Sequence, residues 1–198
     1  MGKIQNEQLE LIAGTHSKDG NSFCGDTYYF AQEGNSFVCL LADGLGSGRY
    51  AYESSQAAAE IVKRVWQEES VEGMMNLINT AMFQKRGAAV ALFKIDFKAR
   101  SFEYTCVGNI RFYLYAKDGK LTYPLPVTGY LSGRPQRYRM ERFTYEPGSK
   151  FLVHSDGVNL LNTKELMRYR SAEQIAAELD AVALKSNDDA TFLVGNLL

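Results

Sequence analysis

A glycine-rich loop containing one aspartate follows a short apolar run in the first quarter of the chain. Residues 37–41 read Phe-Val-Cys-Leu-Leu and lead directly into residues 42–48, Ala-Asp-Gly-Leu-Gly-Ser-Gly. An apolar run of this length is typical of a buried strand, and the glycines behind it allow the backbone to turn tightly. The sequence therefore predicts a strand, a loop and then a helix, with Asp43 presented at the strand end as part of a cation or phosphate site.

Other aspartates lie at the borders of predicted strands. Asp26 opens one such run, Asp156 directly follows another, and the pair Asp188 and Asp189 precedes the last one. These acidic positions are far apart in the sequence but share the same relation to a strand end. We therefore expect them to meet Asp43 in one folded cluster.

A cluster of carboxylates has a specific chemical meaning. Oxygen ligands suit hard divalent cations such as Mg²⁺ and Mn²⁺, and like charges brought together repel unless a cation neutralises them. Two such ions, roughly 3.5–4 Å apart and sharing one carboxylate, can lower the pKa of a bridging water and hold a phosphoryl group for in-line attack. In this scheme Asp43 is the shared ligand, and Gly44 offers its carbonyl to a metal without a side chain in the way.

Length and composition limit the alternatives. A chain of 198 residues suits one domain spanning residues 1–198, and 45% hydrophobic residues can fill a sizeable core. Because 22 basic residues face 23 acidic ones, charge gives no argument for nucleic acid or an anionic membrane as partner. Three scattered cysteines and no long apolar span predict a cytoplasmic protein.

Hydrophobic periodicity predicts the strands and helices. Strands are expected over residues 26–31, 37–41, 88–97, 101–107, 110–115, 150–154 and 191–194. Apolar residues recur at helical spacing in residues 51–65, 71–82 and 175–182, with Ser70 as an N-cap and Ser171 opening a capping box. We expect the first two strands to form a hairpin and residues 88–115 an antiparallel meander. Strands and helices are segregated, which indicates an α+β fold with helices packed on antiparallel sheets.

Four motifs occur together in a characteristic order. They are Asp-Gly-x-Gly at residues 43–46, Val-Gly-Asn at 107–109, Ser-Asp-Gly at 155–157 and Asp-Asp-x-Thr at 188–191. In this order and context the chain resembles the PPM-type metal-dependent serine/threonine protein phosphatases. The resemblance spans nearly the whole chain. It implies a four-layer αββα sandwich, in which two antiparallel β-sheets are flanked by helix pairs, with two Mn²⁺ or Mg²⁺ ions between the sheets.

The resemblance also implies a set of site residues. The metal-binding set would be Asp26, Asp43, Gly44, Asp156 and Asp188. Within this set, Asp43 would bridge the two ions and hold the metal-activated water that attacks phosphorus. We expect Asp189 and Asn109 to hydrogen-bond around these ligands, and Arg49 either to bind phosphate or to be a solvated helix residue.

The chain departs from the family pattern at two places. Many larger members have a His, a candidate general acid, where this chain has Leu45, so another proton donor would be needed. No Arg lies just upstream of Asp26, where larger members bind phosphate, so Lys18 or Arg49 would have to replace it. No long flap or extra domain is expected between the motifs, and substrate selection is assigned to the surface around the metal cleft.

Residues 24–26 and 125–133, with the short length, are most similar to the feedback phosphatase of the bacterial stressosome within this family. This implies that phosphoserine and phosphothreonine on stressosome scaffold proteins are the substrates and that the reaction resets the general stress (sigma-B) response. Two alternatives remain. The chain could be a catalytically weak regulatory binding module of the same fold, or residues 43–46 could be the ATP-binding loop of a histidine-kinase-like ATPase.

Overall fold

Two antiparallel sheets form the centre of the protein. The computed structural model describes residues 2–20, 22–168 and 170–198, in which sheet I has the strand order β1-β2-β11-β10-β7-β8 and sheet II the order β3-β4-β5-β6-β9. The strands of sheet I are β1 Gly2–Gln5, β2 Leu9–His16, β7 Arg111–Tyr115, β8 Leu121–Thr122, β10 Lys150–His154 and β11 Ala190–Leu197. The strands of sheet II are β3 Asp26–Glu33, β4 Ser36–Gly44, β5 Ala88–Asp96, β6 Ser101–Val107 and β9 Glu141–Thr144.

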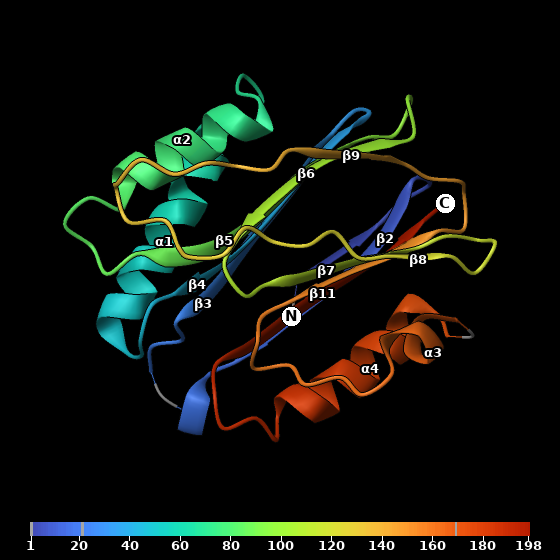
Figure 1. Ribbon diagram of the computed structural model, residues 1–198. Helices are drawn as coiled ribbons and strands as arrows, with labels where there is room; N and C mark the ends of the chain where they lie inside the picture. Colours follow the sequence, from blue (N-terminus) through green and yellow to red (C-terminus); the bar gives the residue numbers. More distant parts are fainter. Residues whose placement is uncertain (1, 21, 169) are drawn as a thin grey trace.

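Each sheet carries helices on its outer face. The helices are α1 Arg49–Val65, α2 Val71–Ala81, α3 Thr163–Arg168 and α4 Ala172–Ala183, with a short 3₁₀ turn η1 at Lys18–Gly20. Ser70 caps α2 by accepting a hydrogen bond from the Gly73 N–H, and Ser171 caps α4 in a complete capping box with Gln174. In Figure 1, α1 and α2 cover sheet II, and α3 and α4 lie against sheet I.

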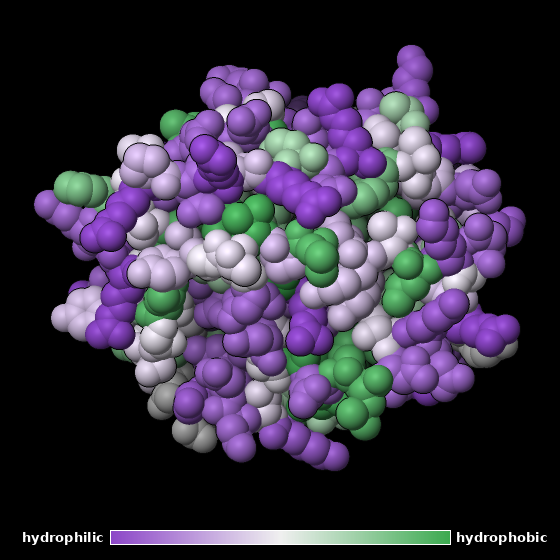
Figure 2. All heavy atoms as spheres, viewed as in Figure 1, coloured by the Kyte–Doolittle hydropathy of each residue, from purple (hydrophilic) through white to green (hydrophobic). Residues whose placement is uncertain are grey.

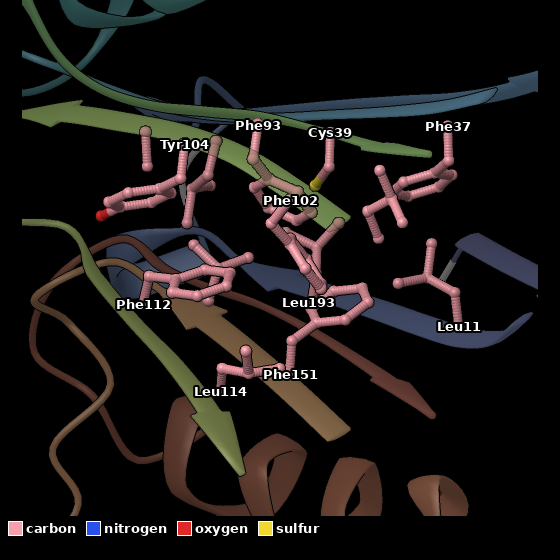
Figure 3. Packing of buried hydrophobic residues seen from close by; sticks show 14 of the residues in the cluster. Leu11, Phe37, Cys39, Phe93, Phe102, Tyr104, Phe112, Leu114, Phe151 and Leu193 are labelled. Atoms are coloured by element: carbon pink, nitrogen blue, oxygen red, sulfur yellow. The ribbon is translucent and has the colours of Figure 1, made fainter. Parts of the chain in front are cut away.

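Three apolar cores separate these four layers. The central core, between the sheets, is built from phenylalanines at strand positions, and Figure 3 shows how they interlock. The ring of Phe93, for example, lies 5.3 Å from both Phe112 and Phe151, centroid to centroid, in edge-to-face arrangements. Separate cores join α1 and α2 to sheet II, and α3 and α4 to sheet I. The four-layer αββα sandwich expected from the sequence is therefore confirmed.

The meander expected over residues 88–115 is wrong at its third strand. β5 pairs with β6 as expected, but β7 pairs with β10 in sheet I. The chain changes sheets at Gly108, whose φ of 120° is open to glycine but rarely to other residues. Because Phe102 and Phe112 enter the same central core from opposite sheets, the apolar pattern alone could not show which sheet the third strand joins.

Residues 123–140, which we call the strap, form the longest connection. The strap leaves β8, passes the ends of β5 and β6, crosses α2 and then enters β9, as the yellow-to-orange trace in Figure 1 shows. Isolated bridges hold it, joining Val127 to Val107 and Leu131 to Ala88. The expectation that no long flap lies between the motifs is therefore wrong, because this segment borders the site described below.

No helix within the described ranges is long and apolar enough to cross a membrane.

Candidate active site

A pocket of about 450 Å³ lies where the ends of both sheets meet. Its lining comprises Asp43, Gly44, Leu45, Gly46, Ala89, Gly108, Asn109, Thr128, Gly129, Tyr130, Asp156, Asp188 and Asp189. Four of these residues are aspartates that come from three distant segments of the chain. The structure thus brings together the acidic positions that the sequence placed at strand ends.

Asp43 and Asp26 are side by side on neighbouring strands. The register of β3 against β4 pairs Asp26 with Asp43 directly. Burial, together with the negative charges of Asp26, Asp156 and the Asp188–Asp189 pair, raises the pKa of Asp43 to about 8. Burial likewise raises the pKa of Asp26 to about 7. Negative charge at these two positions is therefore costly unless a cation lies nearby.

Asp26 also connects the two sheets beneath the pocket. Its Oδ2 accepts a 2.6 Å hydrogen bond from the Ser155 hydroxyl, and the Ser155 Oγ accepts one of 2.9 Å from the Thr191 N–H. The other oxygen, Asp26 Oδ1, is buried and has no hydrogen-bond partner among the described residues. An unpartnered, buried carboxylate oxygen of this kind is suited to an ion or to a water molecule held by an ion.

Asp156 and Asp188 are the exposed members of the cluster. Asp156 follows β10, and its Oδ2 accepts a 2.6 Å hydrogen bond from the Asn109 amide. Asn109 lies in the β6–β7 connection, so this bond fixes the carboxylate from the neighbouring loop. Burial and the charge of Asp188 raise the pKa of Asp156, and the Asn109 bond lowers it. The Asn109 amide therefore orients the Asp156 carboxylate at the edge of the pocket.

Asp189 uses its carboxylate to hold the backbone. Its Oδ1 accepts a 2.8 Å hydrogen bond from the Lys18 N–H, and its Oδ2 accepts one of 2.7 Å from the Gly25 N–H. The side chain is buried, with 7% of its surface exposed. Asp189 therefore ties the loop before β3 to the start of β11 and so positions Asp26, which follows Gly25.

Gly44 is required for packing. A Cβ at this position would lie only 1.9 Å from the Ala51 carbonyl oxygen in the first turn of α1. Gly157, next to Asp156, is similarly restricted, because its Cβ would lie 2.1 Å from the Asp189 carbonyl oxygen. Gly44 was predicted to offer its carbonyl to a metal. The structure adds that a side chain at this position would displace α1.

Arg49 is not brought to the pocket. Its guanidinium is exposed and makes a 2.7 Å ion pair with Glu53 one helical turn later. Sequence reasoning missed three other contributors: Ser155 beneath the floor, Tyr130 on the strap, and Arg86 beside the glycine loop. The Ser-Asp-Gly motif contained a signal for Ser155, whereas the places of Tyr130 and Arg86 depend on long-range packing.

The donor set fits hard divalent cations. Carboxylate and carbonyl oxygens converge on an open pocket, and both Asp43 and the unpartnered Asp26 oxygen require positive charge nearby. Within the described ranges, no three His, Cys, Asp or Glu side chains come close enough to enclose one ion by themselves. Mg²⁺ commonly keeps several water ligands, so a site of carboxylates completed by water is chemically reasonable.

Comparisons with known proteins agree with this picture. A family model described as Stage II sporulation protein E (SpoIIE) matches residues 33–196. The phosphoserine phosphatase RsbX of Bacillus subtilis (strain 168) is 40% identical over 194 residues, which cover 98% of this chain and 97% of RsbX.

Solved structures show the same relationship. A crystal structure of RsbX in complex with magnesium superposes with a TM-score of 0.96 at 39% identity, covering 100% of this chain and 99% of that one. The PP2C phosphatase domain of SpoIIE from Bacillus subtilis shares the fold, with a TM-score of 0.80 at 16% identity over 98% of this chain and 64% of that one. These matches do not favour the ATP-binding alternative for the glycine loop. The chain therefore belongs to the SpoIIE family of PPM-type, or PP2C-type, phosphatases.

Proposed function

We propose that this protein is a metal-dependent phosphatase that removes phosphate from phosphoserine and phosphothreonine in stressosome scaffold proteins. The observation that carries the proposal is the convergence of Asp43, Asp156 and Asp188 on one pocket that also contains Gly44. The substrate class follows from similarity to RsbX, which is a phosphoserine phosphatase. Dephosphorylation would reset the sigma-B stress response.

Divalent ions, when bound, would supply a water of lowered pKa and neutralise the phosphoryl oxygens. We assign Asp26, Asp43, Asp156 and Asp188, with the Gly44 carbonyl, to holding two Mg²⁺ or Mn²⁺ ions, and Asp43 to bridging them. Asn109 orients Asp156 through its 2.6 Å hydrogen bond, and Asp189 is assigned to positioning the loop before Asp26. The RsbX crystal structure with magnesium supports metal dependence.

We further propose that residues 1–198 act as one phosphatase domain in the cytoplasm. Cys24, Cys39 and Cys106 are free thiols in the structure, and unpaired cysteines suit a reducing compartment. The binding-module alternative is not favoured, because every carboxylate that the resemblance requires is present at or directly beneath the pocket.

Phosphate release from a phosphoserine-containing stressosome scaffold protein tests the proposal. We expect turnover with Mn²⁺ or Mg²⁺ and none in chelator. The variant Asp43→Asn should lose about 10²-fold or more in kcat, because one of the charges that hold the cations is removed. A matched control, Asp118→Asn, changes an exposed carboxylate in the β7–β8 turn and should retain wild-type turnover. Full activity in chelator or in Asp43→Asn would contradict the proposal.

A further inference from the structure

Arg86 lies at the rim of the pocket, in the loop between α2 and β5. Its Nη1 is so close to the glycine loop that a Cβ added at Gly46 would lie 2.6 Å from it. Its guanidinium carbon lies 5.2 Å from the centre of the Tyr50 ring, a cation–π distance. Arg86 makes no ion pair with any carboxylate side chain that the structure describes. An exposed guanidinium is thus held in place beside an acidic pocket, with no ion-pair partner among the described side chains.

The loop that carries Arg86 is tied to the walls of the pocket. The Gly87 carbonyl accepts a 3.0 Å hydrogen bond from the Leu45 N–H in the glycine loop. The next residue, Ala88, exchanges two backbone hydrogen bonds with Leu131 of the strap, at 3.1 and 2.9 Å. Tyr130 lies against Gly87, because a Cβ there would come within 2.8 Å of the Tyr130 ring. Arg86 is therefore positioned by the same backbone that forms the pocket.

A second hollow adjoins the pocket on this side. It has a volume of about 400 Å³ and is lined by Tyr50, Glu53, Gln84, Lys85 and Arg86. Arg86 contacts Gly46 from this hollow and is not among the residues that line the pocket itself. A group bound by Arg86 would thus lie next to the phosphoryl group and would belong to a neighbouring residue of the substrate.

The opposite rim has a different charge. The hollow on that side is lined by Asp156, Glu178 and Asp188 together with Lys185. The Glu178 carboxylate would repel an acidic substrate segment there, whereas Arg86 and Lys85 would attract it. Glu53, which lines the same hollow as Arg86, is paired with Arg49. On the face shown in Figure 2, hydrophobic side chains form small groups among hydrophilic ones.

We propose that Arg86, stacked on Tyr50, recognises a carboxylate side chain that flanks the phosphoserine on one side in the substrate. Guanidinium groups bind carboxylates through paired, charge-assisted hydrogen bonds, and a ring beneath the guanidinium limits its freedom before binding. Arg86 is a specificity residue in this account and takes no part in the chemical step. The inference rests on the proposed phosphatase function for its substrate.

Three phosphoserine peptides of equal length test the inference, with glutamates before the phosphoserine, after it, or absent. For one acidic peptide, Arg86→Gln should raise KM about three- to tenfold and leave kcat nearly unchanged. Turnover of the neutral peptide and of p-nitrophenyl phosphate should not change. The control Arg64→Gln, at the far end of α1, should resemble wild type with all substrates. Tyr50→Leu should reproduce part of the Arg86→Gln effect.

Binding separates this inference from the proposed function. Fluorescence anisotropy of the labelled, unphosphorylated acidic peptide should show a dissociation constant about three- to tenfold weaker in Arg86→Gln than in wild type. If Arg86→Gln weakens peptide binding but the wild-type protein does not dephosphorylate the peptides, the proposed function is overturned and the recognition of the acidic side chain by Arg86 is retained. Equal effects on acidic and neutral peptides, unchanged binding, or loss of p-nitrophenyl phosphate turnover in Arg86→Gln would each overturn the assignment of Arg86.

Discussion

At the scale of single residues, Asp43 is the pocket residue whose ionised carboxylate is most strongly disfavoured. Burial and four neighbouring carboxylates raise the pKa of its side chain to about 8. In the unfolded chain the same group ionises near its ordinary value of 3.8. The folded, metal-free protein therefore binds more protons than the unfolded chain at intermediate pH, and this contribution to stability is lost as pH rises toward 8.

The variant Asp43→Asn should remove the part of this pH dependence that comes from Asp43. In chelator, the free energy of unfolding of the wild type should fall between pH 5 and pH 8, and Asp26, with a pKa of about 7, adds to the fall. At pH 8 the metal-free variant should be more stable than wild type by on the order of 1–3 kcal/mol, because the buried charge is gone. Urea unfolding at both pH values measures this difference. If the free energy of unfolding of the variant falls with pH as steeply as that of the wild type, Asp43 is not the group responsible.

Asp188 and Asp189 are neighbours with different roles. Removing the Asp189 carboxylate leaves the N–H groups of Lys18 and Gly25 without their acceptor, so Asp189→Ala should lower the free energy of unfolding by roughly 2–4 kcal/mol. Asp188→Ala removes an exposed side chain that accepts a hydrogen bond from the adjacent Asp189 N–H, so it should cost less than about 1 kcal/mol. Equilibrium unfolding in chelator compares the two. Equal losses would contradict the assignment of Asp189 to holding the loop.

At the scale of elements, the site depends on how closely α1 approaches the end of β4. Gly44→Ala would place a methyl group against the Ala51 carbonyl, and since backbone must move, the cost should exceed about 3 kcal/mol. Gly34→Ala is the matched control, because its Cβ would meet nothing within 4 Å and only its φ of 54° is unfavourable, at about 1–2 kcal/mol. Thermal unfolding followed by circular dichroism distinguishes them. A smaller loss in Gly44→Ala than in Gly34→Ala would refute the close-packing argument.

The elements themselves differ in how far the sequence predicts them. β6 and β10 match the expected residues, and Ser70 and Ser171 cap their helices as predicted, because apolar period and cap chemistry are local signals. β1, β2, β8, β9 and α3 were not predicted. β9 and β1 are short edge strands with half-exposed alternation, and α3 has only six residues, so each owes its structure to a neighbouring element.

The same limit applies to the site. Four aspartates at strand ends were identifiable because the residue type and its place relative to an apolar run are both written in the sequence. The sequence left two roles open for Arg49, because a position in the first turn of a helix does not say which way a long side chain turns. The structure shows the exposed helix residue, paired with Glu53. The position of Arg86 beside the site could not be predicted from the sequence, because its approach to Gly46 depends on how the α2–β5 loop folds back over the glycine loop.

At the scale of the whole molecule, the acidic pocket joins the two sheets. Asp43 and Asp26 come from sheet II, whereas Asp156, Asp188 and Asp189 lie at the ends of strands in sheet I. A cation bound among them would connect both sheets and stabilise the folded state as a unit. Mg²⁺ or Mn²⁺ at 100 times its dissociation constant should add about 2.7 kcal/mol to the free energy of unfolding.

This gain should appear as a rise in melting temperature with ion concentration at pH 7.5. Asp43→Asn should lose most of the rise, because the carboxylate that we propose as the shared ligand is gone, while the control Asp118→Asn should keep it. An equal rise in wild type and Asp43→Asn would place the stabilising ion somewhere other than this pocket.

The most direct test of the central claim is the position of the ions. Crystals of the wild-type protein grown with Mn²⁺ should be measured near the manganese absorption edge, under conditions that also support phosphate release. The account predicts anomalous density in the pocket, between Asp43 and the carboxylates of Asp156 and Asp188. Manganese bound only elsewhere, with this pocket empty at an activating concentration, would contradict it.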